Sequence, residues 1–105
     1  MRVLMLSWEY PPRVVGGLSR HVQELGRAMA PEHDVEVITM GDSNSVEVDH
    51  GVRVHRVQVP GPQTDDFLQW ASQLAMGMLA RGARLINETG PFDIVHAHDW
   101  TSAFP

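Results

Sequence analysis

Two adjacent glycines, Gly16 and Gly17, lie between an apolar run at residues 3–6 and a stretch of helical spacing that begins at Leu18. The N-terminus of a helix presents unpaired N–H groups and the positive end of the helix dipole, so it attracts anions. Glycine lacks the Cβ atom that would keep a ligand away from the backbone. The pair therefore predicts a cradle for a phosphate or diphosphate, such as that of a nucleotide sugar.

The glycine pair alone also allows a second interpretation. It does not form the G-x-G-x-x-G pattern of dinucleotide-binding loops, and no G-K-[ST] sequence follows it as in a P-loop. Two glycines can equally make a tight turn from a strand into a helix with no ligand. A phosphate-binding loop and a plain turn are both compatible with the sequence.

The sequence VHAHDW at residues 95–100 contains the second group of candidate residues. Alternate residues of a strand share a face, so His96 and His98 point the same way, and Asp99 follows at the carboxyl end, where open α/β sheets bind ligands. We expect His98 to face a ligand. The alternative is structural, with His96 satisfied in the core and Asp99 as a helix N-cap. A metal site would lack a third well-spaced ligand, so no metal is assigned.

Alternating strands and helices would position both groups. The continuous apolar run at 3–6 predicts a strand covered on both faces, as in a parallel sheet. Apolar residues recur from Leu18 to Met29 at intervals of four, three and four, which predicts one face of an amphipathic helix. A long, broadly apolar helix is expected at 65–88 and a short central strand at 93–98.

A second strand and a hairpin are expected between the two helices. β-branched residues at 35–40 predict the strand, and valines on both sides of a turn predict a hairpin or a kinked edge strand at 46–59. The alternation of valines slips between Val54 and Val57, which predicts a bulge. The order β-α-β-(β-β)-α-β predicts an α/β fold with a Rossmann-like parallel sheet and flanking helices.

The chain has 105 residues, which is room for one small domain, and we assign residues 1–105 to it. Its formal net charge of −5 and the lack of a Lys/Arg block argue against a nucleic-acid partner. Cysteine is absent, so no disulfide framework is expected and the cytoplasm is the default location. The first apolar run stops at Ser7, too early for a signal peptide or a transmembrane segment.

The sequence SWEYPPRVVGGLSRHV at 7–22, followed by FDIVHAHDW at 92–100, closely resembles the N-terminal domain of retaining glycosyltransferases of the GT-B type. The resemblance spans nearly the whole chain and is strongest to the glycogen and starch synthase-like branch. It implies transfer of a sugar from a nucleotide diphosphate sugar to a saccharide acceptor, with retention at the anomeric carbon and no essential metal or other cofactor. In such enzymes the N-terminal domain mainly holds the acceptor, and a C-terminal domain holds most of the nucleotide.

By position, the resemblance implies substrate contacts for five residues. Gly16 and Gly17 would reach the donor phosphates across the cleft between the two domains. Glu9 would lie near the acceptor. His98 and Asp99 would line the pocket of the transferred sugar, and His98 would bond a sugar hydroxyl or a developing charge.

The chain departs from the family pattern in two respects. Glycogen and starch synthases commonly have a lysine where this chain has Val14, so a broader sugar-transferring relative fits comparably well. The chain also ends at Pro105, so we interpret it as an incomplete half of a GT-B domain, inactive alone and prone to self-association through its open last strand. The alternative is a free-standing phosphate- or ligand-binding Rossmann-like module without catalysis.

Overall fold

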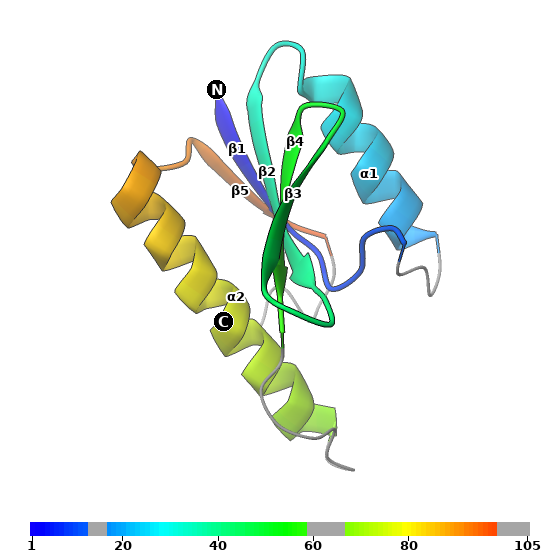
Figure 1. Cartoon of the computed structure of the whole chain (residues 1–105), viewed down its shortest axis with the longest axis vertical. Helices are drawn as coiled ribbons and strands as arrows, with labels where there is room; N and C mark the ends of the chain where they lie inside the picture. The colour runs from blue at the N-terminus through cyan, green and yellow to red at the C-terminus, as the bar shows by residue number, and fades with distance from the viewer. Residues whose placement is uncertain (13–16, 59–66, 99–105) are drawn as a thin grey trace.

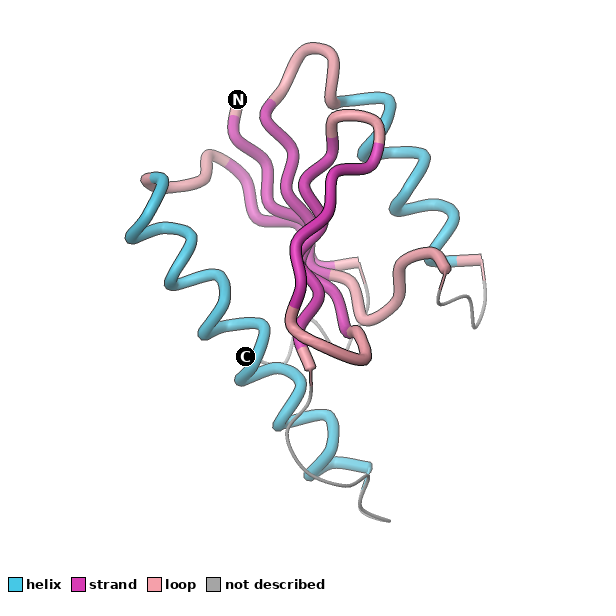
Figure 2. Tube along the Cα trace, viewed as in Figure 1, coloured by secondary structure: helices cyan, strands magenta, loops and turns pink. Residues whose placement is uncertain are grey.

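One sheet lies between two helices in the computed structural model, which describes residues 1–12, 17–58 and 67–98 (Figure 1). In chain order the described elements are β1 (Arg2–Leu6), α1 (Leu18–Met29), β2 (Asp34–Met40), β3 (Ser45–Asp49), β4 (Val52–Val57), α2 (Phe67–Thr89) and β5 (Ile94–Ala97). The strand order is β3-β4-β2-β1-β5, and every pairing is parallel except that of β3 with β4. Figure 2 shows α1 and α2 on opposite sides of the twisted sheet. The predicted α/β fold with a Rossmann-like, mostly parallel sheet is confirmed.

Both faces of the sheet are buried. Successive residues of its central strands pack into two different apolar clusters, one under each helix. The cluster under α1 contains Val3, Met5, Tyr10, Val22, Val35, Val37, Val52 and Val54. The cluster under α2 contains Leu4, Ile38, Met40, Val57, Leu74, Met78 and Leu85. This double burial explains the continuous apolar runs that predict β1 and β2.

The helix α2 spans 23 residues and lies close to the sheet. A Cβ atom added at Gly77 would come within 3.1 Å of Val57 Cγ1, so glycine there permits the close approach of α2 to β4. Leu74 and Met78 are buried, whereas Leu79 and Ile86 on the same helix are exposed. Neither α2 nor the other described helix combines the length and apolar character needed to cross a membrane.

The strands β3 and β4 form the predicted hairpin around His50 and Gly51. Both turn residues have positive φ, 48° and 85°, as in the two-residue turns that match the twist of paired strands. The pairing of β3 with β4 runs without interruption, so the predicted bulge is wrong. The valines change phase because Val54 packs under α1 and Val57 packs under α2.

The sequence predicted a central strand at 93–98, but β5 lies at the edge of the described sheet. It pairs in parallel with β1, from Val3 opposite Ile94 to Leu6 opposite Ala97. All four residues of β5 are exposed. Within the described ranges the outer side of β5 has no neighbouring strand.

Candidate functional site

Hydrogen bonds fix the first part of the loop between β1 and α1. The Ser7 N–H donates to the carbonyl of Ile38 (3.1 Å), and the Ser7 hydroxyl donates to the carbonyl of Glu9 (2.7 Å). The hydroxyl of the buried Tyr10 donates to Asp49 Oδ2 at 2.6 Å. The loop is therefore held at the carboxyl ends of β1 and β2, where open α/β sheets bind ligands.

Asp49, the last residue of β3, connects this loop to α1. Its carboxylate accepts hydrogen bonds from Arg27 Nε (3.2 Å), Arg27 Nη2 (2.6 Å) and Gln23 Nε2 (3.2 Å), and it contacts His50 Nδ1 at 2.9 Å. Burial opposes ionisation of Asp49, but the hydrogen bonds from Arg27, Tyr10 and His50 hold the pKa of this carboxyl well below its usual range. Burial and the bond to Asp49 raise the pKa of Tyr10. An ionised carboxylate thus anchors the loop.

Gly17 is the N-cap of α1 and is exposed, with φ −73° and ψ −14°. These angles are accessible to every residue type, and a Cβ atom built there meets no described atom within 4 Å. The turn therefore does not require glycine at this position, which disfavours the plain-turn interpretation for Gly17. No described atom covers the backbone at Gly17, where the start of α1 has N–H groups that can bind a ligand. Gly16, Val14 and Asp99 lie outside the described residues.

Glu9 is buried at the start of α1, with 3% of its surface exposed. Its Oε1 accepts the backbone N–H of Ser19, the second residue of the helix, at 2.9 Å. Glu9 therefore satisfies one of the N–H groups that the helix start leaves without an intrahelical partner. Its proximity to an acceptor stays a prediction.

His96 and His98 lie on the face of the sheet that α1 covers, because His96 pairs with Met5 of the α1 cluster. Their ring centroids are 4.0 Å apart, which confirms that the two side chains share a face. The His98 N–H donates to the Leu6 carbonyl at 2.9 Å and extends the pairing with β1. His96 is exposed at the edge of the described sheet, so it belongs to neither of the two described apolar clusters.

His21, which the sequence motifs did not single out, lies beside His98. The two ring centroids are 6.0 Å apart in an edge-on arrangement. The contact joins the first turns of α1 to the end of β5, so the two groups of candidate residues meet at one edge of the sheet. The sequence contains one signal for it, since His21 follows Gly17 by about one helical turn. No group of three His, Asp or Glu side chains in the described ranges is arranged to hold a metal.

The sequence profile of the glycosyl transferase 4-like domain matches residues 16–105, so the chain belongs to this glycosyltransferase family. Over its full length it is 41% identical to a glycogen synthase of Mycobacterium tuberculosis. It is 38% identical over 99% of its length to an uncharacterized glycosyltransferase of Methanocaldococcus jannaschii. It is 33% identical over 95% of its length to an alpha-maltose-1-phosphate synthase of Mycolicibacterium smegmatis. The chain spans 29%, 26% and 22% of these three relatives.

The fold is similar to that of a sucrose-phosphate synthase from Thermosynechococcus elongatus. The TM-score is 0.69 at 20% sequence identity, and the match covers 98% of this chain and 28% of the other. The predicted resemblance to GT-B-type glycosyltransferases of the glycogen synthase-like branch is confirmed by these relatives and this fold.

Proposed function

We propose that this chain is the N-terminal, acceptor-side part of a retaining glycosyltransferase that transfers a sugar from a nucleotide diphosphate sugar to a saccharide acceptor. The contact between His21 and His98 carries the proposal, because it joins the helix after the glycine loop to the end of β5. Membership of the glycosyltransferase family supports the reaction class. The domain that holds most of the nucleotide would lie outside residues 1–105.

In the proposed site, the start of α1 receives the phosphates of the donor. Gly16 and Gly17 let a phosphate approach the backbone, and the helix dipole favours the negative charge there. No residue of the first turn of α1 is itself acidic, and the Glu9 carboxylate already accepts the Ser19 N–H of that turn, so the phosphate would use the remaining N–H groups. Glu9 lies on the acceptor side of this loop and holds the first turn through Ser19.

His98, together with Asp99, lines the proposed pocket of the transferred sugar. Either ring nitrogen of an imidazole can bond a sugar hydroxyl, as a donor or as an acceptor. Such a group can also stabilise charge that develops while the bond to the departing diphosphate breaks. His21 and His96 lie against the His98 ring and would restrict its orientation. No metal or other cofactor is assigned a role in this step.

The proposed activity requires more than this chain, because catalysis needs donor and acceptor held together in one closed cleft. The test compares the full reading frame that contains the chain with residues 1–105 alone, using labelled nucleotide diphosphate glucose and a maltooligosaccharide. We expect transfer with retained anomeric configuration by the full protein and none above background by residues 1–105. A product of inverted configuration, or turnover by residues 1–105, would contradict the proposal. The proposed location is the cytoplasm.

We also propose that residues 1–105 alone self-associate by pairing β5 with β5 of a second copy. Ile94 and Val95 are 43% and 57% exposed on this strand edge. An apolar hollow of about 330 Å³, lined in part by Leu79, Ile86 and Val95, adjoins β5 on the α2 side. An open edge beside apolar surface favours pairing with another strand, and a second copy supplies the same complementary edge.

A further inference from the structure

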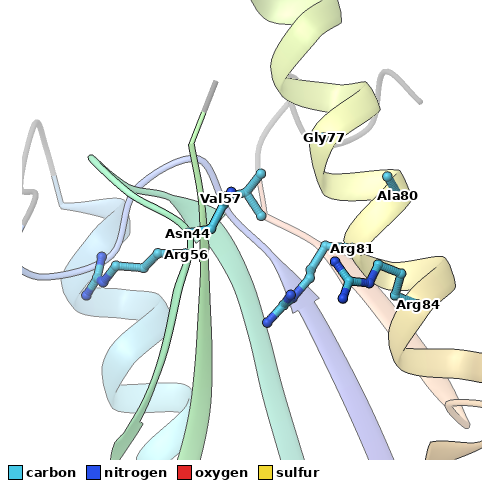
Figure 3. A pocket seen from close by; sticks show the side chains of 7 residues that line it. All are labelled: Asn44, Arg56, Val57, Gly77, Ala80, Arg81 and Arg84. Atoms are coloured by element: carbon cyan, nitrogen blue, oxygen red, sulfur yellow. The ribbon is translucent and has the colours of Figure 1, made fainter. Parts of the chain in front are cut away.

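A pocket of about 150 Å³ lies between α2 and the end of β4, lined by Asn44, Arg56, Val57, Gly77, Ala80, Arg81 and Arg84. Figure 3 shows the side chains of Arg81 and Arg84 extending from α2 toward the sheet, while Arg56 extends away from α2. The Arg56 guanidinium is bound by Glu47 (2.6 Å) and by the Pro11 carbonyl (2.6 Å). Arg81 and Arg84 are therefore the cations that face the pocket.

The charge of Arg81 has no carboxylate partner in the described structure. Arg81 Nη2 donates to His55 Nδ1 at 3.2 Å, and Arg81 Nε is buried without a hydrogen-bond partner among the described atoms. His55 Nε2 is 2.8 Å from Glu36 Oε1, so His55 can accept from Arg81 only as a neutral ring that donates to Glu36. Burial lowers the pKa of His55 and favours that neutral form. Among the described residues, Arg81 thus has a donor without an acceptor and a charge without a carboxylate partner.

Arg84 adds a second cation three residues further along α2. No hydrogen bond or ion pair among the described residues involves its guanidinium, and two like charges at this spacing repel each other. Asn44, on the facing wall, accepts the Gln58 N–H through Oδ1 at 2.9 Å, and its amide NH₂ group is a further donor. The described lining contains these donors and no carboxylate.

We propose that this pocket binds an oxyanion of the phosphate type through Arg81, Arg84 and Asn44. Phosphate oxygens accept several charge-assisted hydrogen bonds at once, which suits a donor lining with two guanidinium groups. The volume is several times the roughly 30 Å³ share of one water molecule, so it admits a phosphoryl group with any organic part at the opening. The pocket is on the α2 side of the sheet, whereas Gly17 and His21 belong to the α1 side.

The test is a titration of ¹⁵N-labelled chain with sodium phosphate at constant ionic strength, followed by NMR. We expect saturable shifts at the amides of Asn44, Arg81 and Arg84 and at the Arg81 Nε–H. Loss of one charge-assisted bond in Arg84→Gln should weaken binding about tenfold. The exposed Arg84 contributes little to folding, so the variant should keep the wild-type spectrum elsewhere.

Arg20→Gln is the matched control, because it removes an exposed cation on α1 outside the pocket lining. It should change phosphate affinity by less than about twofold. Equal affinity of Arg84→Gln and the wild-type chain would overturn the proposal. So would shifts confined to Gly17, Ser19 and Arg20, because phosphate would then bind at the start of α1.

A parallel titration with glucose 1-phosphate distinguishes the two sources of the phosphoryl group. Tighter binding than that of inorganic phosphate would support a sugar phosphate as the ligand, and equal binding would support free phosphate. No saturable binding of either compound would overturn the site. This result is independent of the proposed transferase, whose failure would appear as lack of sugar transfer with phosphate binding at Arg84 unchanged.

Discussion

The carboxylate of Glu9 accepts the backbone N–H of Ser19 at 2.9 Å and so joins the loop after β1 to the first turn of α1. Glu9 is buried, and the same loop is anchored through Tyr10 to Asp49. The start of α1 is therefore positioned by two contacts before any ligand binds. We infer that the exposed backbone at Gly17 is a preorganised surface.

Replacing Glu9 by alanine should lower the free energy of unfolding by about 1 to 2 kcal/mol, because a helix cap is lost and a buried N–H is left without its acceptor. Glu9→Gln keeps an acceptor oxygen and should cost less. Urea denaturation of the chain measures both variants. Glu24→Ala, at an exposed position on α1, is the control and should stay within about 0.5 kcal/mol of the wild type. Equal stability of Glu9→Ala and Glu24→Ala would exclude a capping role.

In the full protein, His98→Ala should lower turnover by roughly tenfold to a thousandfold, the range for losing one positioned polar contact at the reacting centre. His96→Ala should cost less, because this exposed residue acts on the site through its 4.0 Å contact with the His98 ring. Steady-state kinetics and thermal unfolding of both variants test this order. Equal turnover of the two variants would remove His98 from the proposed sugar pocket.

Acidification should destabilise the chain through His55. Burial lowers the pKa of this residue in the folded state, and the charges of Arg81 and Arg53 lower it further. The hydrogen bond and the charge of Glu36 raise it, but by less. The unfolded chain therefore takes up a proton below about pH 6.5 that the folded chain does not, and stability is lost as pH falls. His55→Gln should flatten the dependence of unfolding free energy on pH between about 7 and 5. The same slope in both proteins would contradict this assignment.

Residues 1–105 alone should form dimers or larger assemblies through β5. A charge on this edge, as in Val95→Lys, should give a monomer in light scattering. Val48→Lys is the control, since Val48 is 71% exposed on β3 at the opposite edge of the sheet, and it should leave association unchanged. A monomeric wild-type chain at high concentration, or dissociation caused by Val48→Lys alone, would rule out the β5 interface.

Local patterns in the sequence predicted the helices and strands well, because burial on one face or on both faces of an element determines how its apolar residues are spaced. The interval pattern from Leu18 to Met29 matches α1. The bulge was wrong because Val54 and Val57 face opposite sides of β4 by simple alternation, and each side is covered by a helix. Spacing along one strand cannot reveal that arrangement.

The site was predicted in part for a similar reason. His98 and Gly17 stood out by their position at the ends of a strand and a helix, but the contact of His98 with α1 through His21 depends on β5 pairing beside β1. The contact of His21 with His98 and the exposure of His96 follow from that long-range pairing. The backbone angles of Gly17 show that this position does not require glycine, and the binding of a phosphate there stays a prediction.

The most direct test of the account is the response of the full protein to Gly17→Val, measured with donor and acceptor varied separately. The helical backbone and the open space at this position should let the variant fold, which thermal unfolding can verify. A branched side chain would stand where the donor phosphate approaches the start of α1, so we predict that KM for the nucleotide diphosphate sugar rises by about tenfold or more. Acceptor KM should change by less than about twofold, and Gly17→Ala should lie between Gly17→Val and the wild type. An unchanged donor KM in a folded Gly17→Val protein would contradict the assignment of this helix start to the donor phosphates.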